Sequence, residues 1–340
     1  MSINLKELSE RLGLSPTTVS RALSGYSDVS EATRARVRLA ADAYGYQPNR
    51  AARQVALGRA DAVGIVYSPA TEHLGNPSFL NMLEGLATVL DEFQCDLLLA
   101  CAPGQVELPI YDRMVRGRRV DALVVAHTKR EDERIRYLMA SKFPFVAYGR
   151  TGQSNDFPWL DFDNEACSRL AVEKLVSLGH RRIAYVHAPL DYNFAHERHA
   201  GFRAAMRAAR LAVRAGYVVG GSLDRRSGYA AGQRLLALDP RPTAVVVDNN
   251  IGGIGLIRAL LDAKVRIGDE VSLIVNEGVP ADTLFGGLEV AAVLQPTPFE
   301  TGRSIGRMVR SLVERKPLAE RHVLRQPTFA DGNSIGPAPR

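Results

Sequence analysis

The sequence predicts an α/β protein, with an all-α headpiece followed by two lobes built on doubly wound parallel sheets. Two observations support this fold class. Residues 1–46 carry short amphipathic helical patterns, whereas apolar runs alternate with helical stretches from Ala62 onward. Such alternation is typical of parallel, doubly wound sheets. The length of 340 residues also exceeds what one compact core can serve, so two or three domains are expected.

The headpiece begins with two short helices joined by a tight turn. Asn4 is a candidate cap for the first helix, with Glu7 in the capping-box position, and Gly13 is placed to end that helix. Ser15 caps the second helix, and Pro16 occupies its first turn. This pattern predicts a helix-turn-helix, whose second helix enters the major groove of DNA. The alternative, an ordinary helical hairpin within a core, is disfavoured by the segments that follow.

A third amphipathic helix begins at Ser30 and ends at Gly45. Residues 47–60 come next, and within them Asn49 caps a short, alanine-rich segment with two arginines. A helix this short is marginal in water on its own. The sequence therefore predicts a hinge helix and linker that fold only when docked on a partner.

Positive charge is concentrated at the amino end. The formal net charge is +6, and residues 1–59 hold nine Lys/Arg against five Asp/Glu, whereas the remainder holds 34 against 32. A basic small domain next to a near-neutral large one in the sequence is typical of a protein that binds phosphate groups through the small domain.

Cysteine usage and hydropathy indicate the cellular compartment of the protein. The three cysteines form no CxxC pair, which favours buried apolar side chains over a metal or redox site. No signal peptide is evident at the amino terminus, and no run of 18 apolar residues occurs. We therefore expect a cytoplasmic protein without a membrane span.

Eight strands and eight helices are predicted in the larger part. The candidate strands are residues 63–67, 96–100, 121–125, 145–148, 183–186, 243–247, 271–275 and 291–294. The helical stretches lie at about 78–92, 108–117, 131–141, 164–178, 195–211, 226–238, 251–264 and 299–315. Two similar segments occur at residues 117–125 and 178–186. In each, a glycine ends a helix and a strand follows, which indicates two half-domains of similar structure.

The chain resembles the lactose-repressor (LacI) family of transcriptional regulators over almost its whole length. The most specific matches are residues 18–23, 29–34 with Arg36 and Val37, and 44–49 with the Ala52-Arg53 that follows. The opening through Gly25 looks like the α-glucoside-responsive branch of that family.

The resemblance implies a two-lobed, periplasmic-binding-protein-like fold with a ligand in the cleft and three chain crossovers. We expect an effector-binding and dimerisation domain over 61–330 and a tail over 331–340. The amino-terminal lobe is assigned about 61–158 and 280–296, and the carboxy-terminal lobe about 159–279 and 297–330. Because the tail has no heptads, a coiled-coil tetramerisation segment is not expected.

For DNA binding, the resemblance points to residues of the second helix and of the hinge. These are Ser15, Pro16, Thr17, Thr18, Ser20, Arg21, Ser24, Tyr26, Asn49, Arg50, Ala52, Arg53 and Val55. Arg21 could donate two hydrogen bonds to guanine, and Pro16 could contact a thymine methyl group. Val55 stands where the family inserts a leucine into the minor groove, and a shorter, branched wedge should unstack the central step less well.

For effector binding, the resemblance and the loops at the carboxyl ends of the strands point to a second set. It comprises Asn76, Phe79, His127, Arg150, Trp159, Asp161, Tyr192, Phe194, Arg198, Asn250, Asn276 and Glu277. Bidentate polar groups and flat aromatic side chains suit a sugar. Taken singly, however, Phe79 could be core, His127 a loop residue and Trp159 interdomain packing.

Two departures from the family pattern affect this set. Asn249-Asn250 stands where the family has Asn-Asp, and Asn276-Glu277 stands within the usual Gly-aromatic-Asp-Asp/Asn. Asparagine lacks the charge-assisted acceptor that a carboxylate supplies. The sequence therefore predicts a non-standard effector, or one held mainly by arginines and aromatic side chains, unless Asn276 and Glu277 are bystanders.

The resemblance implies a sequence-specific DNA-binding regulator, a repressor that binds a palindromic operator as a homodimer. A small-molecule effector, a sugar or glycoside with an α-glucoside favoured, would release it. The alternatives are a free carbohydrate-binding receptor, or a regulator of non-sugar metabolism such as that of purines. No phosphate loop, nucleophile elbow or HExxH motif is present, so neither an enzyme nor a cofactor or metal is expected.

Overall fold

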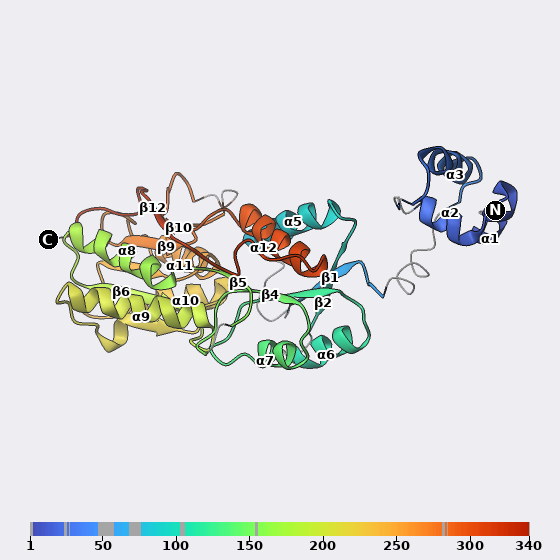
Figure 1. Ribbon diagram of the computed structural model, residues 1–340. Helices are drawn as coiled ribbons and strands as arrows, with labels where there is room; N and C mark the ends of the chain where they lie inside the picture. Colours follow the sequence, from blue (N-terminus) through green and yellow to red (C-terminus); the bar gives the residue numbers. More distant parts are fainter. Residues whose placement is uncertain are drawn as a thin grey trace. The chain divides into compact units, whose positions relative to one another are not determined.

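The computed structural model describes residues 3–23, 26, 28–46, 58–67, 76–102, 106–153, 156–280, 283 and 285–339. The chain divides into two compact units, Met1–Ala60 and Asp61–Arg340 (Figure 1). The predicted hinge helix within 47–60 falls almost wholly outside the described residues.

The described part of the first unit contains three helices, α1 (Leu5–Leu12), α2 (Pro16–Leu23) and α3 (Glu31–Ala43). The predicted capping box is confirmed, because the side chain of Asn4 accepts from the Glu7 backbone at 3.0 Å and Glu7 accepts from the Asn4 backbone at 3.1 Å. Gly13 follows α1 with a left-handed φ of 64°. Leu8, Val19 and other apolar side chains of the three helices form a small shared core.

Two six-stranded sheets form the centre of the second unit. The first runs β11-β5-β4-β3-β1-β2, with β1 (Ala62–Tyr67), β2 (Asp96–Cys101), β3 (Ala122–Ala126), β4 (Phe145–Tyr148), β5 (Trp159–Phe162) and β11 (His322–Arg325). The second runs β12-β10-β9-β8-β6-β7, with β6 (Ile183–His187), β7 (Val218–Gly220), β8 (Ala244–Val247), β9 (Ser272–Asn276), β10 (Ala291–Leu294) and β12 (Thr328–Ala330). Neighbouring strands pair in parallel except β10 and β12, which are antiparallel.

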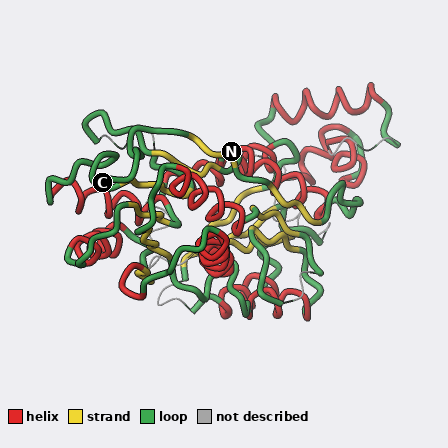
Figure 2. Tube along the Cα trace, turned by 90° about the vertical axis from the view of Figure 1, so that its left-hand side faces the viewer, coloured by secondary structure: helices red, strands yellow, loops and turns green. Residues whose placement is uncertain are grey.

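Helices cover both faces of each sheet. In Figure 2 the strands, drawn in yellow, lie between helices, drawn in red. The first sheet packs on α5 (Pro77–Asp91) and α12 (Pro298–Val313) on one face, and on α6 (Leu108–Arg116) and α7 (Glu133–Ala140) on the other. The second packs on α8 (Asn164–Ser177) and α9 (Asn193–Ala208), and opposite them on α10 (Arg225–Leu236) and α11 (Asn250–Asp262). The predicted α/β fold class with doubly wound sheets is confirmed.

The predicted division of segments between the lobes is wrong for three segments. Residues 159–162 belong to the first sheet as β5, although they were assigned to the carboxy-terminal lobe. Within 280–296, assigned to the amino-terminal lobe, β10 lies in the second sheet. Within 297–330, assigned to the carboxy-terminal lobe, α12 and β11 pack in the first lobe. The chain thus crosses between sheets after β5, after β10 and after β11.

Close helix packing explains where α12 goes. A Cβ atom at Gly85 of α5 would overlap the backbone carbonyl of Phe299, and one at Gly302 of α12 would overlap that of Met82. Two glycines facing each other's backbones let the helices approach closely, so α12 joins α5 on the first sheet.

The carboxy-terminal residues pack on the second lobe. Ser334 is buried and its hydroxyl donates to the Leu273 carbonyl at 2.7 Å, while the Ala338 amide donates to Leu178. No helix in the described part of the chain is long and apolar enough to cross a membrane.

Candidate functional site

A cavity of about 360 Å³ lies between the two lobes, at the carboxyl ends of their strands. This volume falls in the lower part of the ~300–1,000 Å³ range of small-molecule sites. Eight of the predicted effector residues line it: Asn76, Phe79, His127, Asp161, Phe194, Arg198, Asn250 and Glu277. Both lobes contribute, so a molecule bound there would touch both at once.

Arg198 of α9 connects several polar groups of the cavity wall. Its Nε donates to Asn164 Oδ1 at 2.9 Å, one Nη donates to Glu277 Oε1 at 3.0 Å, and the other donates to the Asp248 carbonyl. The guanidinium also lies over the ring of Phe194, 5.1 Å from its centroid. Although desolvation lowers the pKa of Arg198, Glu277 and other neighbours raise it by more in total, so the side chain stays charged.

Asp248, whose backbone carbonyl accepts a hydrogen bond from Arg198, was not predicted from the sequence. It follows β8 directly, is fully buried, and accepts the Ala188 amide with both carboxylate oxygens, at 2.9 and 3.1 Å. The side-chain amide of Asn249 donates to it at 2.8 Å. Burial raises the pKa of Asp248 to about 6, against the opposing effect of Arg198. An acidic residue directly after an unbroken apolar strand was the signal that could have found it.

Two cavity residues hold a left-handed backbone directly after a strand. Glu277 follows β9 with a φ of 71°, and His127 follows β3 with a φ of 50°. Non-glycine residues rarely adopt this conformation, and such strain clusters at functional sites. At Glu277 it directs the carboxylate toward the cavity, beside Arg198.

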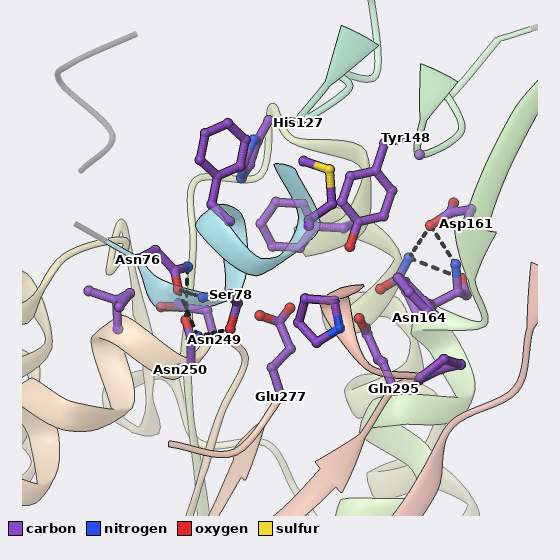
Figure 3. Close-up of a pocket in the computed structure, with 18 of the residues that line it drawn as sticks. Asn76, Ser78, His127, Tyr148, Asp161, Asn164, Asn249, Asn250, Glu277 and Gln295 are labelled. Atoms are coloured by element: carbon purple, nitrogen blue, oxygen red, sulfur yellow. Dashed lines mark hydrogen bonds between the residues drawn. The ribbon is translucent and has the colours of Figure 1, made fainter. Parts of the chain in front are cut away.

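Polar side chains collect on two sides of the cavity (Figure 3). On one side, Asn250 Nδ2 lies 3.3 Å from Asn76 Oδ1, which joins the two lobes across the cleft. Asn249 lies beside them and caps α11 by accepting the Gly252 amide at 2.7 Å. On the other side, Asn164 Nδ2 donates to Asp161 Oδ1 at 3.3 Å.

Apolar side chains lie between these polar sides, including Phe79, Met82 and Phe194. Several lining residues were not predicted, because they lie in segments whose pattern indicates strand ends, caps or linkers. The missed polar ones are Ser78, Thr128, Tyr148, Asn164, Asn249, Gln295 and Thr297.

Four predicted effector residues do not line the cavity. Arg150 is occupied by Asp161 at 2.9 Å and Glu197 at 2.8 Å. Trp159 lies between Arg150 and the ring of His322, which stacks on it at 5.1 Å. The other two are Tyr192, which packs beside His127 and Phe194, and Asn276, which is buried in β9 with neither side-chain polar atom hydrogen-bonded among the described residues.

The Arg150–Glu197 pair links the lobes outside the cavity. Arg150 follows β4 in the first lobe, whereas Glu197 lies on α9 in the second. Burial raises the pKa of Glu197, and Asp161 adds to this, while Arg150 opposes it. Backbone hydrogen bonds from Asn193 to Thr128 and from Arg130 to Asp191, both 2.9 Å, run beside the pair. Arg150 therefore has a contact role between lobes in this structure.

In the headpiece, α2 exposes Pro16, Thr17, Ser20 and Arg21. The Ser15 hydroxyl caps this helix by accepting the Thr18 amide at 3.0 Å, and the two hydroxyls lie 2.8 Å apart.

Arg21 is partly engaged by neighbours. Its Nε donates to Asp28 at 3.2 Å, and its guanidinium lies over the exposed Tyr26 ring, 4.9 Å from the centroid. The remaining predicted DNA contacts, Ser24, Asn49, Arg50, Ala52, Arg53 and Val55, lie outside the described residues.

Two models of known protein families match the chain. The model described as "Bacterial regulatory proteins, lacI family" matches residues 4–49, and "Periplasmic binding proteins and sugar binding domain of LacI family" matches residues 40–329. The chain belongs to the LacI family. It is therefore a DNA-binding transcriptional regulator with a sugar-binding domain, and the expectation that it is not an enzyme is confirmed. Regulators of the LacI family bind operator DNA and sugar effectors and act as dimers.

Individual LacI-family relatives extend the comparison. The chain is 36% identical to the HTH-type transcriptional regulator RafR of Escherichia coli over 334 residues, 98% of each protein. A structure of a transcriptional regulator CelR–cellobiose complex aligns with a TM-score of 0.74 at 26% identity, covering 98% of this chain and 99% of that one. The fold is also that of a lac repressor dimer bound to operator and the anti-inducer ONPF, with a TM-score of 0.84 at 21% identity over 99% and 100% of the two chains.

Among the described residues, no three His, Cys, Asp or Glu side chains are placed to hold a metal ion.

Proposed function

We propose that this LacI-family chain is a cytoplasmic repressor that reads a palindromic operator through α2 and is released by a sugar or glycoside. One observation carries the effector half of the proposal. A buried arginine, a carboxylate and aromatic side chains converge on one cavity between two lobes. Hydroxyl groups of a sugar satisfy such donors and acceptors, while the apolar face of the ring covers the aromatic side chains.

A glycoside with two sugar rings suits the cavity best. Its polar groups lie on two sides, with Asn76 and Asn250 on one and Asp161 and Asn164 on the other, and apolar side chains lie between them. A relative has been solved with cellobiose, a disaccharide. The likeness of the opening residues to the α-glucoside-responsive branch favours an α-glucoside.

The proposed mechanism couples closure of the lobes to the hinge. Effector bound between Asn76 and Arg198 contacts both lobes and stabilises one arrangement of them. In this proposal residues 47–60 form a hinge helix and linker between a DNA-binding headpiece, residues 1–46, and an effector domain, 61–330. The hinge helices of a dimer dock on the operator through Arg50, Arg53 and Val55. A coupling free energy of about 1–3 kcal/mol between the sites is typical for such regulation.

A binding selection followed by titration tests the DNA half. Operators would be selected from random duplexes with the full-length protein, and affinity measured by fluorescence anisotropy. We expect Arg21→Ala to weaken the selected operator by about 5- to 150-fold, since one bidentate guanine contact is worth ~1–3 kcal/mol. Arg38→Ala, an exposed arginine of α3, is the matched control. Equal losses in both variants, or no twofold-symmetric site among the selected duplexes, would contradict the assignment of α2.

Thermal-shift screening tests the effector half. A ligand that binds the native state stabilises it by about 2.7 kcal/mol at 100 times its Kd. We expect shifts from glycosides, and weaker ones in Arg198→Lys. A shift from purines alone would reject the sugar in favour of a non-sugar effector.

A further inference from the structure

The cavity wall carries more negative than positive charge. Arg198 is the one Lys or Arg side chain among its described lining residues, whereas Asp161 and Glu277 both contribute carboxylates. A third carboxylate, that of Asp248, is buried behind Arg198. An incoming ligand therefore meets a surface that is neutral at best.

The positive charge of Arg198 is already paired within the protein. Glu277 lies 3.0 Å from one Nη, and the other contacts go to Asn164 and to the Asp248 carbonyl. The side chain is 2% exposed, and one face of the guanidinium is turned to Phe194. A ligand can hydrogen-bond to the remaining N–H groups, but it does not meet an uncompensated charge.

No Lys or Arg other than Arg198 lines the cavity among the described residues of the domain. Arg150 is paired with Asp161 and Glu197 and does not line the cavity. The segments 68–75, 103–105, 154–155 and 281–284, which are wholly or largely outside the described residues, contain no Lys or Arg in the sequence.

Most helix N-termini beside the cavity, the other usual anion site, are also occupied. The start of α9, whose Phe194 lines the cavity, has no side-chain cap, but its Asn193 amide donates to the Thr128 carbonyl at 2.9 Å. Four other helices that begin there are each capped by a side chain. Asn76 caps α5, Asp163 caps α8, Asn249 caps α11 and Thr297 caps α12. Pro77 and Pro298 remove a further N–H from α5 and α12. Binding a phosphate would require breaking these caps.

Glu277 in contrast has a second carboxylate oxygen, Oε2, that accepts no hydrogen bond from the described residues, and the side chain lines the cavity. Its Oε1 takes the hydrogen bond from Arg198, and its side chain keeps 29% of its surface exposed. Hydroxyl groups are donors for such a carboxylate, and these charge-assisted bonds are the stronger kind. A phosphate or carboxylate at the same place would meet like charge.

We propose that the cavity selects an uncharged glycoside and rejects phosphorylated or carboxylated sugars, and that Glu277 sets this selection. The inference rests on the proposed sugar effector. It adds that Glu277 both neutralises Arg198 and accepts ligand hydroxyls.

Matched neutral and anionic sugars test the selection. The full-length protein is titrated calorimetrically with maltose and maltose 6′-phosphate, trehalose and trehalose 6-phosphate, and methyl α-glucoside and methyl α-glucuronide. We expect a neutral member to bind at least about 100-fold more tightly than its anionic counterpart, as like-charge juxtaposition predicts. An anionic member that binds as tightly as its parent would overturn the inference, and this comparison needs no variant.

Two variants then test the residue. Glu277→Gln keeps the shape but removes the charge, and we expect it to narrow the neutral-to-anionic ratio by at least about tenfold. Glu270→Gln, at an exposed glutamate of the same lobe, should leave the ratio unchanged. An unchanged neutral-to-anionic affinity ratio in Glu277→Gln would show that Glu277 does not set the selection. If no sugar of either kind binds, the proposed sugar effector itself fails.

Discussion

Replacing Arg198 by lysine is the sharpest test of how the two halves of the site are held together. Lysine keeps the positive charge beside Glu277 but cannot reach Asn164, Glu277 and the Asp248 carbonyl at once, as the guanidinium does. It also loses the flat contact with Phe194. The substitution therefore keeps the charge and removes only the planar, forked arrangement of the guanidinium donors.

The structure sets the size of the effect. Lysine can replace about one of the three hydrogen bonds, and each bond that involves a charged group contributes ~1.5–3 kcal/mol. Loss of two, partly offset by relaxation of a smaller side chain, gives about 3 kcal/mol. For the larger unit, Asp61–Arg340, an unfolding entropy of ~2.1 cal/mol/K per residue means that each kcal/mol lowers Tm by ~1.7 °C, so we expect a drop of about 5 °C.

Thermal melting of the full-length protein measures this drop, and the transition followed is that of the larger unit. Arg203→Lys, at an exposed position of α9, is the matched control and should melt like the wild type. If Arg198→Lys melts within about 1 °C of that control, less than one kcal/mol separates the two variants, and the reasoning that Arg198 holds the two halves of the site together is wrong.

Three further predictions concern other parts of the chain. Because burial raises the pKa of Asp248 from 3.8 to about 6, the folded state favours its protonated form, and stability should fall as pH rises from about 4 through about 6. Asp248→Asn should flatten the dependence of Tm on pH in this range. An unaltered dependence would contradict the prediction. Gly85→Ala should lower the urea midpoint by overlapping Phe299, at a cost of about 1–3 kcal/mol, although alanine normally stabilises a helix, so a raised midpoint would contradict the packing of α5 on α12. Asn4→Ala should cost the headpiece about 1 kcal/mol, seen as faster amide exchange in α1 with an unchanged melt of the larger unit, and equal exchange rates would argue against the capping box.

Local signals in the sequence were enough for the local structure. The cap at Asn4 and the left-handed Gly13 follow from residue types that satisfy or end a helix by themselves. The buried strands were visible because a strand covered on both faces is almost continuously apolar, as in β8.

Long-range pairing could not be obtained in that way. Alternation of strands and helices does not specify which sheet a strand joins, so the places of β5 and β10 were misassigned. β5, β7, β11 and β12 were missed because each has at most four residues and lacks a long apolar run.

The same limit applies within the site. Arg150 looked like a ligand contact by its position after a strand, but Glu197, 47 residues later, occupies it. Asp248 was not predicted because its partners are distant in the sequence. A carboxylate's partners, Ala188 among them, come from a neighbouring strand and are evident only in the folded chain.

Operator binding with and without effector tests the central claim most directly. The full-length protein would be titrated against its selected operator by fluorescence anisotropy, at a saturating concentration of the glycoside that binds the cavity. A coupled regulator should bind the operator about 5- to 150-fold more weakly with the glycoside present. An operator affinity that is the same with and without bound glycoside would contradict the claim that the cavity controls the headpiece.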